Sequence, residues 1–313
     1  MEYRRLGRTN LNVSLLGLGS GGRSKLGQAY GQDQAAVTRV VRGALEIGVN
    51  FVDTAPAYDR AEELLGRALE GFPRDRYVLC TKMLPVQDDV LQSPDALRTS
   101  LEASLRRLRT DYVDVFYLHA VHPDWADQVI ERFREPLERA RRDGLIRFSG
   151  VTEAFQTDHN HLALRTLLPL GLFDVAMVGY NVLSPAPAQH VFPLAQAGDV
   201  GVVVMCAVRG VLLDPQRIRA VVGEWKAAGL LAWEPVADAD PLGWLLGPWA
   251  ASMAEVGYKF AAAHPAVSTV LTGTGRLEHL QANAQAILGT PLPATLVEGA
   301  RALFAPVSRN ASF

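Results

Sequence analysis

The chain has 313 residues, of which 49% are hydrophobic and 20% are charged, a composition typical of a globular protein with ample material for a core. Its 31 basic and 33 acidic residues leave a formal net charge of −2 without long runs of either sign, so we expect no nucleic-acid or membrane partner. No stretch approaches the roughly 18 apolar residues of a membrane span, and two cysteines provide no disulfide framework, so a reducing, cytoplasmic location is expected.

Short apolar segments alternate with segments of helical periodicity along the chain. A polar start with turn residues at Gly7 and Asn10 predicts a short hairpin-like segment. Eight strands are then predicted, at 13–19, 50–53, 77–82, 112–119, 146–151, 173–180, 201–206 and 267–272. Several are nearly continuous runs of Val, Leu and Phe, as in parallel strands that are buried on both faces. This alternation predicts an α/β fold, a closed (β/α)8 barrel of the TIM type, with residues 1–313 forming a single domain.

Helices are predicted where apolar residues recur every three or four positions. One such stripe within 37–45 ends at Gly48, another occupies 277–287, and a third begins after Ser93 and Pro94, which would be an N-cap and a first-turn proline. Residues 212–246 are rich in Pro, Gly, Asp and Trp and exceed an ordinary barrel connection in length. We therefore expect a long loop or insertion before the last strand that helps to shape a pocket.

Polar side chains stand at or just beyond the carboxyl ends of three successive predicted strands. They are Asp53, Tyr58, Lys82 and His119. Taken singly, each has an ordinary structural explanation, as a turn cap, a packed aromatic, a solvated lysine or a core histidine. In a barrel, however, these strand ends converge on one mouth, where barrel enzymes have their active sites. We therefore expect the four side chains to lie together.

These residue types suit the reduction of a carbonyl group, which needs a hydride from a cofactor and a proton for the developing alkoxide. Tyr58 could donate the proton if a neighbouring cation lowered its pKa from the ordinary value of about 10. Lys82 would be that cation, and Asp53 would hold it in place. His119 could hydrogen-bond the substrate oxygen and polarise the carbonyl.

The glycine-rich segment 17–22 offers a different interpretation. Its sequence GLGSGG fits the G-x-G-x-x-G dinucleotide pattern directly after a strand, and Asp53 would then be the acid that binds the cofactor ribose. Two features argue against this Rossmann alternative. Residues 23–32 form a polar loop, so no helix opens within the glycine turn, and the other three polar residues at the strand ends would have no role.

The residues around the candidate site resemble the aldo-keto reductase family. The segment FVDTAPAY at 51–58, with Glu62 four residues later, resembles the family signature. The pair Thr81-Lys82 and the segment DYVDVFYLH at 111–119 match its next two motifs, and the likeness continues through 144–151, Tyr180-Asn181 and 271–283. The resemblance thus covers essentially the whole chain. It implies a catalytic tetrad of Asp53, Tyr58, Lys82 and His119, and a nicotinamide dinucleotide, more commonly NADP(H) than NAD(H), lying across the barrel mouth.

The resemblance also assigns residues to the two ends of the cofactor. Near the nicotinamide it implies Gly19, Ser20, Thr152, Glu153, Met177, Tyr180 and Cys206. Near the adenosine it implies Gly273, Thr274, Gly275, Arg276, His279 and Asn283. The chain departs from the family pattern where Thr152 and Glu153 replace Ser and Asn, where Met177 replaces Gln, and at Cys206, where the usual aromatic is missing. An ionised Glu153 can accept a hydrogen bond from the carboxamide nitrogen but cannot donate one to its oxygen.

Arg276 bears on the choice between the two cofactors. Its guanidinium could bind a 2′-phosphate, which would favour NADP(H). It could equally be an exposed residue of the first helical turn, in which case NAD(H) is possible. The family habit favours NADP(H).

Two functions from different classes are consistent with these residues. The intact tetrad favours an oxidoreductase that acts on a small-molecule aldehyde, ketone, alcohol or sugar. The altered nicotinamide contacts leave open a cofactor-binding regulatory or sensor protein with little turnover. Candidates for lining a substrate pocket are Tyr30, Trp225, Trp233, Trp244 and Trp249.

A metal site is not expected. The histidine pairs at 119 and 122 and at 159 and 161 have no matching carboxylate or cysteine framework. His159 and His161 are expected at the surface.

Overall fold

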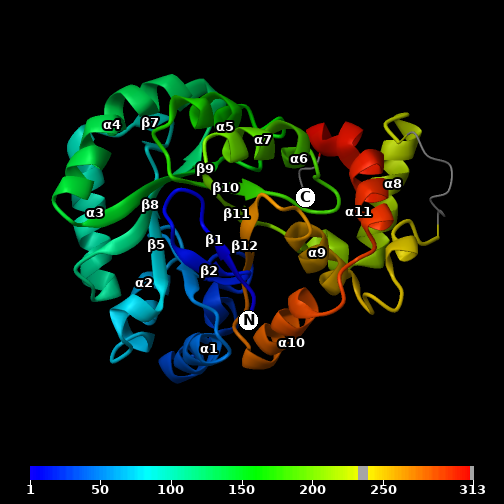
Figure 1. The fold of residues 1–313 in the computed structure, drawn as a ribbon, viewed down its shortest axis with the longest axis horizontal. Helices are drawn as coiled ribbons and strands as arrows, with labels where there is room; N and C mark the ends of the chain where they lie inside the picture. The colour runs from blue at the N-terminus through cyan, green and yellow to red at the C-terminus, as the bar shows by residue number, and fades with distance from the viewer. Residues whose placement is uncertain (232–238, 311–313) are drawn as a thin grey trace.

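Eight parallel strands close into a barrel in the computed structural model, which describes residues 1–231 and 239–310 (Figure 1). In chain order they are β3 (Leu16–Gly19), β4 (Phe51–Asp53), β5 (Val78–Met83), β8 (Val113–Val121), β9 (Ile146–Glu153), β10 (Val175–Gly179), β11 (Gly201–Met205) and β12 (Val267–Thr272). Strand β12 pairs with β3 and completes the ring. The predicted TIM barrel is therefore confirmed. The closed ring excludes the open Rossmann sheet, so segment 17–22 is part of a strand and loop of the barrel.

A short antiparallel hairpin of β1 (Tyr3–Arg5) and β2 (Asn12–Ser14) lies at the amino end of the barrel. Leu6, in the turn of the hairpin, is fully buried. It packs directly on Gly201 at the start of β11, where an added Cβ would be 2.6 Å from the Leu6 side chain. The prediction of a single strand over 13–19 was wrong about where the barrel strand begins, because residues 13 and 14 belong to this hairpin. The Ser14 N–H donates to the Asn50 side chain at 2.7 Å, and barrel pairing starts only at Leu16.

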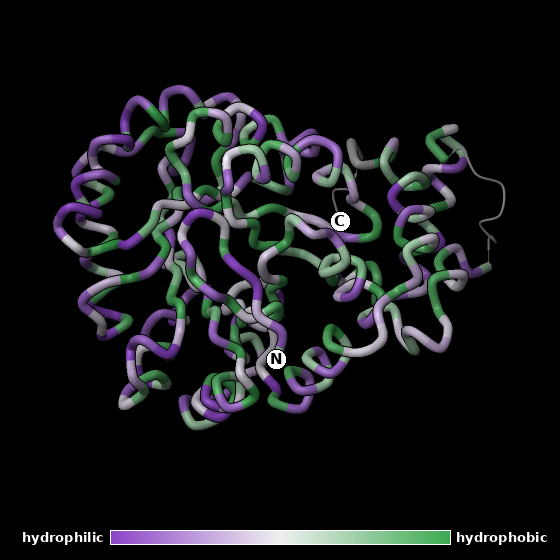
Figure 2. The backbone as a smooth tube through the Cα atoms, in the orientation of Figure 1, coloured by the Kyte–Doolittle hydropathy of each residue, from purple (hydrophilic) through white to green (hydrophobic). Residues whose placement is uncertain are grey.

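Helices cover the outside of the barrel. They are α1 (Gln34–Glu46), α2 (Ala61–Ala68), α3 (Pro94–Leu108), α4 (Ala126–Arg142), α5 (Leu162–Leu167), α6 (Pro187–His190), α7 (Phe192–Ala197), α8 (Pro215–Ala227), α9 (Met253–Ala262), α10 (Leu277–Leu288) and α11 (Ala294–Phe304). The predicted stripe of α3 is buried, and hydrophobic and hydrophilic residues alternate along α3 and α4 in Figure 2. Within the described ranges, no helix combines the length and the apolarity needed to cross a membrane.

The stretch 212–246 before the last strand is partly helical. It contains α8 and a short 3-10 helix over Gly243–Leu245. Figure 1 shows α8 beside α11 at one end of the molecule, where the rings of Trp225 and Phe304 are 6.1 Å apart. The expected insertion is present, but its helix was not predicted, because only three of its thirteen residues are buried and its periodicity is correspondingly faint.

Candidate active site

A buried ion pair lies at the carboxyl ends of two neighbouring strands. Asp53 ends β4, and Lys82 is the next-to-last residue of the adjacent strand β5. The Lys82 Nζ is 2.6 and 2.7 Å from the two carboxylate oxygens of Asp53, and it donates to the Thr54 carbonyl oxygen at 2.8 Å. Burial alone would lower the pKa of Lys82, but the charge of Asp53 and its hydrogen bonds outweigh burial and raise that pKa. Lys82 is therefore a cation at neutral pH.

Tyr58 lies in the loop after β4 with its ring near this cation. The Lys82 Nζ is 5.2 Å from the ring centroid of Tyr58. Burial raises the pKa of Tyr58, and the charge of Lys82 only partly offsets this effect. The sequence suggested a lowered pKa, which was wrong in direction because burial outweighs the cation. The hydroxyl therefore keeps its proton at neutral pH.

The loop after β3 supports Tyr58. A Cβ at Gly21 would lie 2.8 Å from the Tyr58 ring, so only glycine permits this approach. The Gln28 side chain accepts from the Arg60 N–H at 3.0 Å and joins the loop to the chain that follows Tyr58. The family resemblance assigns Gly19 and Ser20 of this loop to the nicotinamide, but the sequence does not connect the loop with Tyr58, because the contact joins residues far apart in the chain.

His119 on β8 completes the group. Its ring meets the Tyr58 ring edge-on, with the centroids 5.9 Å apart and the planes at 90°. Burial, reinforced by the charge of Lys82, lowers the pKa of His119 to about 3, so the imidazole is neutral at physiological pH. A neutral imidazole can donate one hydrogen bond and accept one. The strand order β4, β5, β8 thus brings together the four residues predicted to meet at the mouth.

The backbone after His119 is strained, and Thr152 holds it. Ala120 has a φ of 53°, a left-handed conformation that is unfavourable for residues other than glycine, and the pairing of β8 with β9 shifts register there. The Ala120 N–H donates to the Thr152 Oγ1 at 2.7 Å. The Thr152 hydroxyl, which the resemblance assigns to the nicotinamide, is therefore engaged in positioning the chain next to His119.

Glu153 is buried, and both of its carboxylate oxygens contact protein groups. Its Oε2 is 2.6 Å from the His161 Nδ1, and its Oε1 accepts from the Gly179 N–H at 2.8 Å. The prediction that His161 lies at the surface was wrong, because this partner draws the imidazole inside, where it is 1% exposed. The sequence contains both members of the pair, but their contact depends on the path of the loop between β9 and α5.

The other nicotinamide-side residues are distributed between the core and the mouth. Met177 packs in the barrel interior. Tyr180 is fully buried, and its hydroxyl accepts from the Arg301 Nε at 2.9 Å. Cys206 directly follows β11 with a φ of 60°, and the Asn181 Nδ2 donates to its carbonyl oxygen at 3.1 Å.

Gly19 and Ser20 end the first barrel strand. The Ser20 N–H donates to the Asp53 carbonyl oxygen at 2.9 Å, which ties this turn to the ion pair. The Ser20 Oγ is buried, and the described part of the chain provides no hydrogen-bond partner for it. A buried hydroxyl of this kind is costly unless a ligand or water completes it.

The residues assigned to the adenosine end surround the start of α10. Gly273, Thr274 and Gly275 link β12 to this helix, and the Thr274 Oγ1 accepts from the Arg276 N–H at 3.1 Å. Gly275 packs directly on the backbone of Gly27, where a Cβ would lie 2.4 Å from the Gly27 Cα.

On the helix itself, Arg276 and His279 are exposed. Asn283 is partly buried, and its Nδ2 donates to the Thr272 Oγ1 at 2.8 Å and to the Tyr258 hydroxyl at 3.2 Å. The adenosine-side residues thus form a contiguous loop and first helical turns, with the two basic side chains open to solvent.

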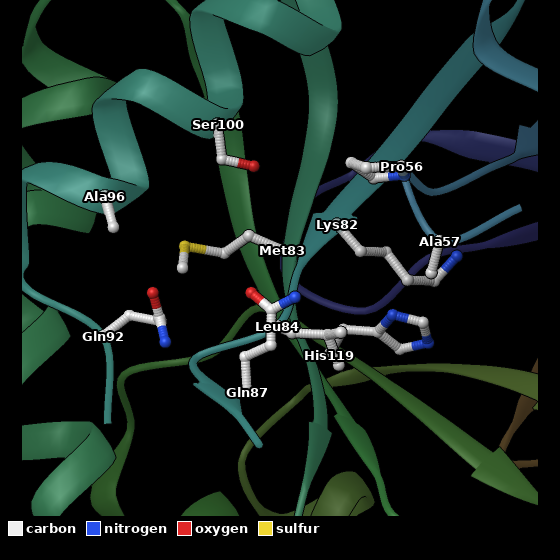
Figure 3. Close-up of a pocket in the computed structure, with 10 residues that line it drawn as sticks. All are labelled: Pro56, Ala57, Lys82, Met83, Leu84, Gln87, Gln92, Ala96, Ser100 and His119. Carbon is white, nitrogen blue, oxygen red and sulfur yellow. The ribbon is translucent and has the colours of Figure 1, made fainter. Parts of the chain in front are cut away.

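A cavity of about 270 Å³ opens beside Lys82 and His119. Its remaining walls come from the loop after β4, the end of β5 with the segment that follows it, and α3 (Figure 3). The four predicted pocket-lining aromatic residues that the structure describes, Tyr30, Trp225, Trp244 and Trp249, do not border this cavity.

The described aromatic residues of that set lie elsewhere in the fold. Trp225 is buried beside α11, and the indole N–H groups of Trp244 and Trp249 donate to backbone carbonyls three and four residues away. Tyr30 is 66% exposed, and Trp233 lies outside the described residues. Among the described residues, no group of three or more His, Cys, Asp or Glu side chains could hold a metal ion.

A TIM barrel with reactive side chains gathered at the carboxyl ends of its strands is the architecture of an enzyme, and comparison with known proteins narrows the class. Residues 16–299 match the sequence profile of the aldo/keto reductase family. The chain belongs to this family of oxidoreductases.

Individual relatives agree with this assignment. L-galactose dehydrogenase from Arabidopsis thaliana is 28% identical over 299 residues, which cover 92% of this chain and 88% of that protein. The NADH-specific methylglyoxal reductase of Escherichia coli is 31% identical over 228 residues, 64% of each protein. Among solved structures, the holo form of an aldo-keto reductase from Bacillus halodurans has a TM-score of 0.73 at 27% identity, covering 97% of this chain and 96% of that one.

The lowered pKa of His119 predicts how stability depends on pH. Below about pH 6.5 an unfolded histidine takes up a proton, whereas folded His119 does so only near pH 3, so acidification favours unfolding. The wild type should lose about 1–2 kcal/mol more than the variant His119→Asn between pH 7 and pH 5. Urea unfolding at both pH values measures this difference. The exposed His279→Asn is the control, and an equal change in both variants would contradict the assignment.

The contact between Thr152 and Ala120 predicts a second effect on stability. Thr152→Val keeps the shape but leaves the Ala120 N–H without its acceptor, which should lower the free energy of unfolding by about 1–3 kcal/mol. Thr152→Ser should cost about 0.8 kcal/mol, for the deleted methyl group alone. The NMR signals of the His119 ring should shift in the valine variant and stay in place in the serine variant. If both variants shift them alike, the hydroxyl is not what holds this backbone.

Proposed function

We propose that this protein transfers a hydride from a reduced nicotinamide cofactor to the carbonyl group of a small-molecule aldehyde or ketone, with Tyr58 as the general acid. In the reverse direction it would oxidise the corresponding alcohol or sugar, with Tyr58 as the general base. The observation that carries the proposal is the fixed Lys82 cation, bound to Asp53 and 5.2 Å from the ring centroid of Tyr58. A proton donor beside a buried cation suits a substrate oxygen that gains negative charge during reduction.

Each residue of the tetrad has a distinct proposed role. Tyr58 holds its proton at neutral pH and donates it to the substrate oxygen, while Lys82 stabilises the tyrosinate left behind. Asp53 keeps Lys82 in place and compensates its charge. Neutral His119, at the edge of the Tyr58 ring, donates a hydrogen bond to the same oxygen. In the oxidative direction Tyr58 takes the proton back.

The cofactor we propose is NADP(H), with NAD(H) as the alternative, and its nicotinamide would supply the hydride. The buried Ser20 hydroxyl without a partner fits a ligand at the mouth. The amino end of α10 has no side-chain cap, so its free N–H groups fit a phosphate, and exposed Arg276 stands beside them. Glu153 does not fit the role of carboxamide ligand, because both of its carboxylate oxygens bind the Gly179 and His161 groups of the protein. The Thr152 hydroxyl only accepts from the Ala120 N–H, so its own O–H fits a carboxamide oxygen.

That misfit favours a second candidate, a cofactor-binding sensor with little turnover. A nicotinamide without its usual polar contacts would be held less firmly at the hydride side. We prefer the enzyme, because a sensor has no need of a buried cation beside a tyrosine and a neutral histidine. We further propose that residues 1–313 act as one domain.

The proposed chemistry predicts that Tyr58→Phe, which removes only the hydroxyl, lowers kcat by about 10²- to 10⁴-fold for every aldehyde that the wild type reduces. The loss of NADPH or NADH absorbance as the cofactor is oxidised measures the rate. Cofactor affinity, followed by fluorescence quenching, should stay unchanged. The control is Tyr30→Phe, at an exposed tyrosine outside the tetrad.

Two outcomes would count against this prediction. Full activity in Tyr58→Phe would exclude the tyrosine as proton donor. Tight cofactor binding by the wild type, with negligible turnover of every carbonyl tested, would favour the sensor instead.

A 2′-phosphate contact predicts a selective effect at Arg276. Arg276→Ala should weaken NADPH binding by about tenfold or more and leave NADH binding nearly unchanged, because only NADPH carries the phosphate that the guanidinium would bind. Titration of both cofactors by fluorescence quenching measures the two dissociation constants. Arg134→Ala, at an exposed position of α4, is the matched control. Equal weakening of both cofactors would show that Arg276 does not select between them.

A further inference from the structure

The cavity beside the tetrad extends away from Tyr58 toward α3. Lys82 and His119 form one wall, and the opposite wall consists of side chains from the segment after β5 and from the first turns of α3. Its volume of about 270 Å³ is just below the roughly 300 Å³ at which pockets for drug-sized ligands begin. A small molecule with its carbonyl group near His119 therefore has room for a short chain on this side.

Three neutral polar side chains point into the cavity. Figure 3 shows Gln87, Gln92 and Ser100 directed toward its centre, facing Lys82 and His119. The Gln92 Nε2 donates to the Val90 carbonyl oxygen at 3.1 Å, which holds that amide in place. Across residues 1–231 and 239–310, no protein group is hydrogen-bonded to the Gln87 amide or to the Ser100 hydroxyl. These groups are free to bind a ligand.

The segment that carries the two glutamines is itself ordered by backbone pairing. Strands β6 (Val86–Gln87) and β7 (Val90–Leu91) form a small antiparallel hairpin after β5, and Gln92 follows it. The Arg132 Nη1 of α4 donates to the Gln92 carbonyl oxygen at 3.2 Å. The amides therefore project from a fixed frame instead of a free loop.

The cavity offers no unpaired charge. Among the described residues that line it, the ionisable ones are Lys82, whose charge Asp53 compensates, and His119, which is neutral. A carboxylate or phosphate on the ligand would find no free cation in the described lining to bind it. Amides and a hydroxyl both donate and accept, as the hydroxyl groups of a ligand do. The apolar lining residues Met83, Leu84 and Ala96 suit the carbon atoms of such a ligand.

We propose that this cavity binds the tail of an uncharged, hydroxylated carbonyl substrate, with Gln87, Gln92 and Ser100 as the residues that determine specificity. The inference rests on the proposed function, because it takes the substrate carbonyl to lie between Tyr58 and His119. It adds the substrate class: short polyhydroxy aldehydes are favoured over apolar aldehydes of equal length and over aldehydes that carry an acid group.

The test compares three aldehydes of four carbon atoms: erythrose, butanal and succinic semialdehyde. The wild type should have the highest kcat/KM for erythrose. The double variant Gln87→Leu/Gln92→Leu should lower kcat/KM for erythrose about tenfold by raising KM, because two hydrogen-bonding amides are lost. The kcat/KM for butanal should change by less than about twofold. Ser100→Ala should act in the same direction with a smaller effect. Gln216→Leu, at an exposed glutamine of α8, is the control for a surface leucine.

A binding measurement separates this inference from the proposed function. Ligand-observed NMR with erythritol and with 1-butanol needs no turnover, and the double variant should weaken erythritol binding selectively. If no aldehyde is reduced but erythritol binding behaves in this way, the proposed function fails and the cavity assignment stands. If aldehydes are reduced but the double variant changes kcat/KM for erythrose and butanal by the same factor, or changes neither, the cavity assignment is overturned and the proposed function stands.

Discussion

The burial of an ammonium group beside a carboxylate is the constraint on which the rest of the site depends. Removing Lys82 and Asp53 from water costs several kcal/mol per ion unless close geometry and further hydrogen bonds offset it. The contacts with both oxygens of Asp53 and with the Thr54 carbonyl offset part of that cost, and burial still raises the pKa of Asp53. They are available only because β4 and β5 are neighbours and end at the same mouth. The parallel pairing of β4 with β5 therefore sets the electrostatics around Tyr58.

On the β9 side of the mouth, Thr152 and Glu153 form hydrogen bonds with other parts of the barrel. Thr152 binds the strained backbone at Ala120, and Glu153 binds His161 and the end of β10. These bonds link β8, β9 and β10 to one another just where His119 must be held. Both carboxylate oxygens of Glu153 are engaged in this way, whereas the Thr152 hydroxyl only accepts there and keeps its O–H to donate.

Glycines at the mouth are explained by packing. Gly21 allows the first loop to contact the ring of Tyr58, and Gly275 meets the backbone of Gly27 across the junction of β12 and β3. A side chain at either position would collide with its neighbour. Within the segment 17–22 that imitates a dinucleotide motif, Gly21 thus permits a close approach between loops, whereas Gly22 has open space and a φ of 71°, which glycine readily adopts.

The sequence alone determined the eight-stranded barrel, because continuous apolar strands alternate with amphipathic helices, and it determined which four side chains meet, because successive strand ends converge on one mouth. It did not determine the environment of those side chains. The raised pKa of Tyr58, the inward pairing of Glu153 with His161, and the cavity in front of Gln87 depend on burial and on contacts between loops. Such contacts join residues whose separation in the chain carries no periodic signal, so only the tertiary structure decided them.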